Sequence, residues 1–213
     1  MLQTRTKPPA FIIAIVGGSG AGKTTLCQSL KQILGENNAL RLSQDNFFKD
    51  VPRVGKPEDM DFDQPDWIKF SELKKCLFEL KEQRSTSCPI YDFEKGESIA
   101  NAEFLEARPV VIVEGTLVLH DPELRDNVDF SIYLDLEKEE RLERRLKRDS
   151  GYNSYNSGED IKKRFERFVQ PAHLQYVEKQ KELVSCVFDA EKSPEVNAQI
   201  AIEKIRELKL DLA

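Results

Sequence analysis

The segment GGSGAGKTT, residues 17–25, constrains this chain more than any other feature of its sequence. It follows the apolar run Phe11–Val16 and precedes a helical pattern over Lys23–Leu34, which is the strand–loop–helix context that a phosphate-binding loop requires. Its glycines let backbone N–H groups turn inward toward phosphates, and the helix N-terminus adds positive potential. We expect Lys23 to contact the β- and γ-phosphates and Thr24 to ligate Mg²⁺. The residues expected to bind the nucleotide are Gly17, Gly18, Ser19, Gly20, Ala21, Gly22, Lys23, Thr24 and Thr25.

Short apolar runs alternate with longer helical patterns along the rest of the chain. This alternation predicts an α/β fold with a mostly parallel sheet flanked by helices in three layers. We expect further strands at Ala39–Leu42, Val110–Val113, Phe130–Leu134 and Val184–Phe188. We expect further helices at Ile68–Glu82, Glu137–Arg148, about 159–183 and Glu195–Leu208, with Pro171 breaking or kinking the third of these.

Length, charge and cysteine spacing limit the class of protein. A chain of 213 residues is expected to form one domain. Its net charge of -6 argues against a general nucleic-acid binder. No apolar run approaches the roughly 20 residues that cross a bilayer, and the polar start of the chain has no signal core, so we expect a cytoplasmic protein without a membrane partner. The four cysteines are scattered, which predicts free thiols.

Two acids fall at or shortly after the ends of predicted strands. Asp45 comes after Ala39–Leu42, and Glu114 follows Val110–Val113. Ligands of such sheets bind beyond the carboxyl ends of the strands, so both acids should face the glycine-rich loop. We expect Asp45 to act as general base and to reach the metal, and Glu114 to hold the metal. A helix cap or turn is the simpler alternative for Asp45.

The predicted helix EKEERLERRLKRD places four arginines on one stripe. Arg141 and Arg144 each have a glutamate four residues earlier with which they can pair. Arg145 and Arg148 have no such partner, and they suit the charge of a transferring phosphoryl group. We therefore expect a lid over approximately 137–160, and the alternative is a solvated helix.

A phosphate-binding loop occurs in switches, motors and transferases, so the loop alone does not decide among these three classes of protein. The Asn-Lys-x-Asp segment by which GTPase switches read guanine does not occur, and nothing in the chain requires a larger motor assembly.

Seven segments in this order resemble the uridine kinase family of phosphate-loop kinases, over roughly residues 10–190. The segments are GGSGAGKTT, SQDNFF, FDQPD, PIYDF, VIVEG, RLERRLKRD and FVQPAHLQY. The resemblance implies a P-loop kinase fold with an arginine-bearing lid, in one domain spanning 1–213, with an acceptor-binding insertion over approximately 46–100.

The resemblance also implies roles for particular residues. Asp45 would be the general base on a nucleoside 5′-hydroxyl, and Asp63 would bind the ribose hydroxyls. Tyr91 and Phe93 would line the base pocket. Glu114 would help to hold Mg²⁺.

Arg145 and Arg148 would serve both the lid and the substrate in this family. The cofactors implied are ATP and Mg²⁺.

The chain departs from the family where the base is read. Gly96 and Ser98 stand where the family has a histidine and an arginine, and Asn153 and Tyr155 replace an RGR-like segment. Arg164 stands where a base-contacting glutamine often lies. We expect an ATP-dependent kinase of a nucleoside-like acceptor, which can form a homo-oligomer. The alternatives are a kinase of nicotinamide riboside, pantothenate or a sugar phosphate, and a non-catalytic nucleotide-binding regulator.

Overall fold

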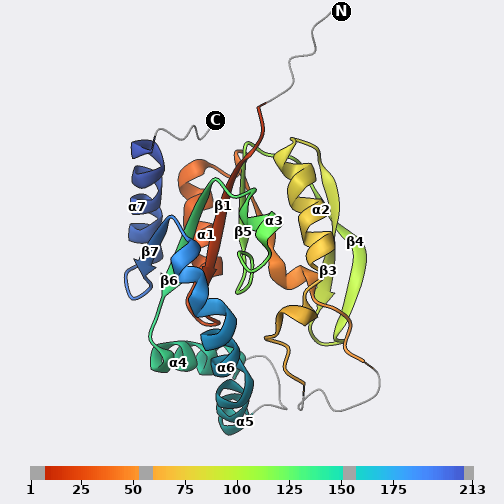
Figure 1. The fold of residues 1–213 in the computed structure, drawn as a ribbon, viewed down its shortest axis with the longest axis vertical. Helices are drawn as coiled ribbons and strands as arrows, with labels where there is room; N and C mark the ends of the chain where they lie inside the picture. The colour runs from red at the N-terminus through yellow and green to blue at the C-terminus, as the bar shows by residue number, and fades with distance from the viewer. Residues whose placement is uncertain (1–7, 53–59, 151–156, 209–213) are drawn as a thin grey trace, which may run out of the picture.

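The computed structural model describes residues 8–52, 60–150 and 157–208, and its centre is a sheet of five parallel strands (Figure 1). The strand order is β2-β5-β1-β6-β7. The strands are β1 (Phe11–Gly17), β2 (Ala39–Ser43), β5 (Val110–Glu114), β6 (Phe130–Asp135) and β7 (Cys186–Asp189). Every pairing in this sheet is parallel, which confirms the predicted fold class.

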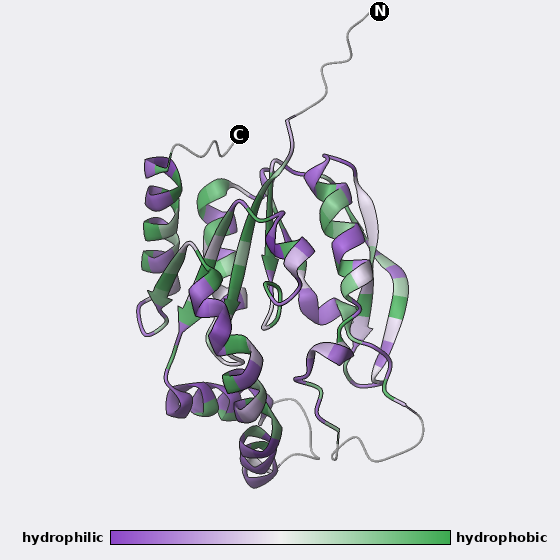
Figure 2. Ribbon diagram, in the orientation of Figure 1, coloured by the Kyte–Doolittle hydropathy of each residue, from purple (hydrophilic) through white to green (hydrophobic). Residues whose placement is uncertain are grey.

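Helices cover both faces of the sheet, so the central strands are apolar on both sides. Successive side chains of a strand point to opposite faces. Ile13 and Ile15 of β1 therefore pack on one face with α1 (Lys23–Leu34) and α7 (Pro194–Glu207). Ile12 packs on the other face with α2 (Phe70–Lys81). Figure 2 shows the result as hydrophobic strands between helices whose outer faces are hydrophilic.

The predicted helices form close to their expected limits. The helix after the glycine-rich loop has the predicted bounds, and Gly35 follows its last residue. Helix α2 begins two residues later than predicted, because Ile68 pairs with Phe48 in an isolated bridge. A 3-10 helix, η3 (Pro65–Trp67), precedes that bridge. A short helix, α3 (Pro122–Arg125), was not predicted.

The helix does not break at Pro171, which was one of the two outcomes predicted there; the other, a kink, stays a prediction. The chain stays helical from 158 to 183, although the spacing of its hydrogen bonds changes along the run. The segments are α5 (Gly158–Arg164), the π-helical η4 (Phe165–Val169), α6 (Gln170–Ala172), the π-helical η5 (His173–Val177) and the 3-10 helix η6 (Glu178–Leu183). The Gln170 N–H donates to the Phe165 carbonyl, five residues back. This wider spacing accommodates a residue without an N–H, so the helix passes through the proline.

An antiparallel hairpin beside α2 was not predicted. It consists of β3 (Thr86–Asp92) and β4 (Glu97–Leu105), and its pairing register shifts between Cys88 and Ile90. Pro89 lies at that shift, since proline cannot donate to the ladder. Pro89 interrupts the alternation, and β4 is mostly exposed, so the usual strand patterns are weak here.

All four cysteines are free thiols, as predicted, and three of them are buried. Within the described residues, no helix combines the length and the apolar character needed to cross a membrane.

Candidate active site

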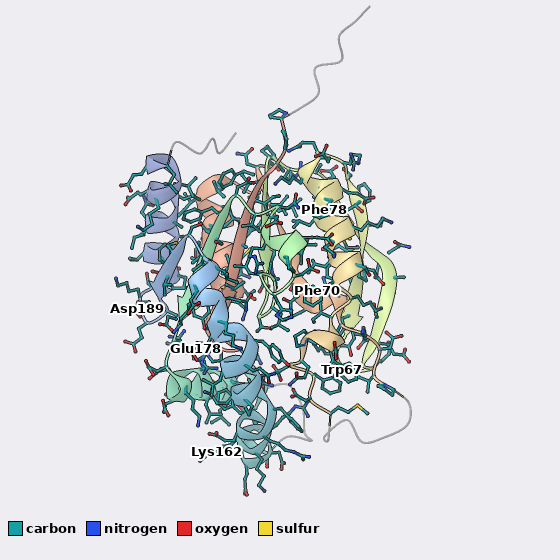
Figure 3. The ribbon with its side chains drawn as sticks, in the orientation of Figure 1. Trp67, Phe70, Phe78, Lys162, Glu178 and Asp189 are labelled. Atoms are coloured by element: carbon teal, nitrogen blue, oxygen red, sulfur yellow. The ribbon has the colours of Figure 1, made fainter. Side chains whose placement is uncertain are left out.

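A cavity of about 1210 Å³ opens at the carboxyl end of the sheet and collects most of the predicted site residues. Its lining includes Ser19, Gly20, Gly22, Lys23, Thr24, Thr25, Asp45, Asp63, Tyr91, Phe93, Glu114, Arg145 and Arg148. Gly17, Gly18 and Ala21 belong to the same loop but do not line the cavity. Figure 3 shows Trp67 beside the start of α2 and Lys162 on α5 at this end of the molecule. A single small-molecule pocket usually has about 300–1,000 Å³, and this cavity exceeds that range.

The glycine-rich loop is wrapped around its own lysine. The Lys23 ammonium donates to the carbonyls of Gly17 and Gly18 over 3.1 and 3.0 Å. Gly20 has a φ of 87°, a left-handed conformation that favours glycine. Burial lowers the pKa of Lys23, while the nearby carboxylates of Glu114 and Asp45 oppose this change. The loop thus holds a cation in the lining of the cavity.

The N-terminus of α1 faces the same cavity. Among the described residues, no side chain caps this helix, and its first turn contains no acid. Its first N–H groups are therefore left for a ligand, and the helix dipole favours an anionic one.

Asp45 and Glu114 lie together at the carboxyl ends of neighbouring strands, as the sequence predicted. Glu114 is paired in register with Ser43 of β2 and with Ile15 of β1, which leads into the loop. Asp45 follows β2 in a 3-10 helix, η1 (Gln44–Phe47). Its carboxyl is accessible from the cavity, yet the surrounding protein raises its pKa by desolvation, and the charge of Glu114 raises the pKa further.

Hard oxygen atoms that could bind a divalent cation converge here. They are the Thr24 hydroxyl and the two carboxylates, Asp45 and Glu114, all lining one cavity. Such oxygens are the ligands that Mg²⁺ prefers. The described part of the chain contains no group of three or more His, Cys, Asp or Glu residues that could hold a metal. The donor set thus fits a cation that arrives with phosphate ligands of its own.

Arg41 is a site residue that sequence reasoning missed. Its Nε donates to Glu114 Oε1 over 3.0 Å, and its Nη2 forms a salt bridge with the same oxygen. The signal for it was an arginine between the apolar residues Leu40 and Leu42 of the strand ALRLS. An arginine within a strand that borders a buried sheet is expected to pair with an acid, but the sequence does not say which acid provides the partner.

The arginine helix α4 (Lys138–Asp149) borders the cavity, but its pairings differ from those expected. Arg144 donates to the Ala190 carbonyl over 3.0 Å rather than pairing with the glutamate one turn earlier. Arg145 and Arg148 are not uncompensated, because both contact Asp149, over 3.1 and 2.7 Å. Arg145 also donates to the Ser19 hydroxyl over 3.1 Å, which joins this helix to the phosphate loop.

Arg141 is the largest correction to the predicted stripe. It is buried, with 2% of its surface exposed, and supports the loop from below instead of facing solvent. It donates to the Leu136 carbonyl and to the Gln170 side chain over 3.2 and 2.7 Å. A Cβ atom on Gly18 would lie 2.6 Å from Arg141 Cδ and 3.0 Å from His173 Nδ1. Arg141 and His173 therefore leave room only for a glycine at position 18.

Burial also changes the titration of His173. It is 8% exposed, and burial next to Arg141 lowers its pKa from 6.5 to about 4. The unfolded chain therefore binds a proton below about pH 6.5 that the native protein does not bind until about pH 4. Stability from this group is fully present above pH 6.5 and is lost as the pH falls toward 4. The free energy of unfolding falls by about 3 kcal/mol in total when the pH drops through this range.

We predict that His173→Gln flattens the pH dependence of stability between pH 6.5 and 5. The free energy of unfolding from urea titrations at several pH values measures this effect. His120→Gln is the matched control, since His120 is the other histidine and is exposed. An equal slope in wild type and His173→Gln would contradict the assignment.

The other side of the cavity combines aromatic rings with an acid. The ring of Tyr91 lies 4.9 Å from that of Phe93 and 5.5 Å from that of Phe48, centroid to centroid. Phe93 is 65% exposed, which is unusual for a phenylalanine that only packs in a core. Desolvation raises the pKa of Asp63, and the charge of Arg145 opposes it.

Some of the positions at which this chain differs from the uridine kinase pattern lie in the described part of the structure. Gly96 and Arg164 line the cavity, whereas Ser98 does not. The Arg164 guanidinium lies 5.2 Å from the ring centroid of Phe62 and donates to the Met60 carbonyl over 2.9 Å. Asn153 and Tyr155 lie outside the described residues.

The glycine-rich loop lies between a central parallel strand and an uncapped helix. Two strand-end carboxylates and several arginines surround the same large cavity, and together these features define a phosphate-loop kinase. The phosphoribulokinase/uridine kinase family model matches residues 12–197. The chain belongs to this family.

Named relatives agree with this membership. The uridine kinase of Chlamydia pneumoniae is 33% identical over 92% of this chain and 89% of its own length. The uridine kinase of Alkaliphilus metalliredigens is 31% identical over 93% and 95%. Uridine kinase-like protein 5 of Arabidopsis thaliana is 27% identical over 92% of this chain, but the chain spans only 42% of that protein.

A solved structure shares the fold. A possible uridine kinase from Bacillus stearothermophilus superimposes with a TM-score of 0.61 at 20% sequence identity, covering 87% of this chain and 92% of its own.

Proposed function

We propose that this protein transfers the γ-phosphoryl group of ATP to the 5′-hydroxyl of a nucleoside. The observation that supports this most is that Asp45 borders the same cavity as the phosphate loop and as the Asp63–Tyr91–Phe93 side. A proton acceptor between a phosphate cradle and a polar-aromatic pocket suits transfer to an alcohol. The names of the relatives, which are uridine kinases, support the nucleoside class.

The phosphate side of the cavity would hold Mg·ATP. The loop 17–25 and the N-terminus of α1 would cradle the phosphates, and Lys23 would leave its own carbonyls to contact the β- and γ-phosphates. Thr24, Asp45 and Glu114 would hold Mg²⁺ directly or through water. When bound, the cation supplies charge neutralisation at the transferring phosphoryl group.

Asp45 would act as the general base. It would accept the proton of the acceptor hydroxyl as that oxygen bonds to the γ-phosphorus, and the bond from this phosphorus to the β–γ bridging oxygen would break to release ADP. The raised pKa of Asp45 suits a group that must take up a proton. Arg145 and Arg148 would stabilise the charge on the transferring group.

The acceptor would lie on the opposite side. Asp63 would bind the ribose hydroxyls, and Tyr91 and Phe93 would line the base pocket, where the exposed ring of Phe93 would be covered. Residues approximately 46–100 would form the acceptor-binding insertion, and approximately 137–160 the lid of one domain spanning 1–213. Cytoplasmic location and homo-oligomer formation stay predictions.

We predict that ATP turnover rises about tenfold or more when a ribonucleoside is added, because an ordered acceptor hydroxyl replaces water. A coupled assay of ADP release, with detection of the phosphorylated product by mass spectrometry, measures this. The panel contains uridine, cytidine, a purine nucleoside, nicotinamide riboside, pantothenate and ribulose 5-phosphate. Each nucleoside is accompanied by its 2′,3′-dideoxy analogue, which removes the hydroxyls that Asp63 would bind.

The panel separates the alternatives. Activity with pantothenate or ribulose 5-phosphate alone would replace the nucleoside by another hydroxyl acceptor. ATP binding without acceptor-stimulated ADP release would indicate a regulatory protein instead of a kinase.

A further inference from the structure

Arg41 reaches the candidate metal site from the edge of the sheet. It lies on β2, the edge strand, two positions before Ser43, which is in register with Glu114. Residues two apart on a strand share a face and lie about 6.6 Å apart, a span that an arginine side chain can cover. The Arg41 side chain is 35% exposed, whereas that of Glu114 is 3% exposed. The ion pair therefore connects a buried carboxylate to a cation at the solvent-facing edge.

The donors around Glu114 converge on one of its two oxygens. Oε1 accepts from Arg41 Nε and Nη2, from Ser43 Oγ at 3.2 Å and from Thr24 Oγ1 at 3.3 Å. Within the described residues, no donor reaches Oε2, and Glu114 lines the cavity. Thr24 gives its proton to Oε1, and its hydroxyl oxygen accepts from Arg41 Nη2 over 3.5 Å. Arg41 thus fixes the rotation of the carboxylate, with Oε2 as its remaining acceptor.

Arg41 is one of the cations that offset the two acids at this end of the sheet. Asp45 and Glu114 are the two acids beside the loop, and Lys23 and Arg41 are the cations that interact with both. The charges of Arg141 and Arg148 also act on Lys23, and that of Arg148 acts on Asp45, but Arg41 is the arginine that contacts Glu114 directly. Without Arg41, Glu114 and Asp45 would face the cavity beside the Thr24 hydroxyl with one cation fewer, and their mutual repulsion would favour a divalent ion between them.

We propose that Arg41 is a charge-balancing positioning residue, which orients Glu114 and prevents the two carboxylates from capturing a divalent cation before the nucleotide binds. The proposal rests on the magnesium site of the proposed function, but not on the identity of the acceptor. The cation then enters with the phosphates of its nucleotide, which supply the ligands that the protein alone lacks. Lysine would preserve the charge but not the two-pronged contact with the carboxylate.

The test measures binding of Mn²⁺ to the full chain at pH 8 in the absence of nucleotide. Electron paramagnetic resonance reports the concentration of the free ion. We expect weak binding by the wild type. Arg41→Met should bind Mn²⁺ about tenfold or more tightly, since removal of one positive charge beside two carboxylates favours a cation. Arg41→Lys should remain near the wild type, because it keeps the charge. The double variant Arg41→Met/Glu114→Gln should lose the gained affinity, which locates the ion at Glu114.

Circular dichroism and thermal unfolding establish that each variant is folded. A role confined to structure would lower the melting temperature of Arg41→Met without raising its affinity for Mn²⁺. The proposal would be overturned if Arg41→Met bound Mn²⁺ no more tightly than the wild type. It would also be overturned if Arg41→Lys bound Mn²⁺ as tightly as Arg41→Met. Because the assay contains neither nucleotide nor acceptor, its failure would leave phosphoryl transfer to be decided by the acceptor panel.

Discussion

Asp45→Asn should lower kcat for phosphoryl transfer by about 10²- to 10⁴-fold while leaving the affinity for the nucleotide nearly unchanged. Asparagine keeps the shape and the hydrogen-bonding oxygen of the side chain but cannot accept the proton of the acceptor hydroxyl. The rate of product formation, together with calorimetric binding of a non-hydrolysable ATP analogue, separates the two effects. The loss should appear in kcat because a base acts at the transition state and not in binding.

Asp66→Asn is the matched control for this experiment. Asp66 lies in the same region of the chain, is exposed, and does not line the cavity. We expect wild-type kinetics from it. If Asp45→Asn turned over at the wild-type rate, Asp45 would not be the base, and the placement of the acceptor hydroxyl beside it would be wrong.

Lys23→Met should reduce kcat/KM for ATP by about 10²- to 10³-fold, the loss typical of one fixed donor to a developing negative charge. Methionine retains most of the aliphatic length and removes the ammonium. Lys23 is held at the loop by the carbonyls of Gly17 and Gly18 and by the field of Glu114 and Asp45, so its ammonium is already beside the cavity before it turns to the phosphates. Steady-state kinetics with varied ATP at saturating acceptor measure the change.

Lys31→Met provides the comparison, since Lys31 lies on the same helix and forms an ion pair with Glu36 over 2.7 Å. It does not line the cavity. An equal loss in both variants would show that the helix, and not the ammonium of Lys23, causes the defect.

Both variants test a site whose backbone frame the sequence predicted well. The glycine-rich loop, the helix after it and the strands leading to Asp45 and Glu114 form as expected. These features depend on apolar runs and turn residues within short segments, so they can be recognised in one sequence. The hairpin β3–β4 could not be recognised in this way, because Pro89 interrupts one strand and the other is polar and exposed.

The side-chain partners of the site were predicted less well than its frame. Arg141 was expected to pair on its own helix, yet it is buried under the phosphate loop and bonds to Gln170. The stripe pattern was correct, but a helix pattern says only which residues share a face. Whether this face meets solvent, a cavity or another helix depends on how the helix packs.

The sequence by itself determined the phosphate loop, the parallel α/β frame and the two strand-end carboxylates, since each depends on neighbouring residues and on backbone geometry. The tertiary structure decided which cation neutralises Glu114 and which side chains support Gly18. Arg41 and Glu114 are 73 residues apart in the chain and meet only because β2 and β5 pair in register. Contacts of this kind depend on strand order and register, which no local pattern of residues specifies.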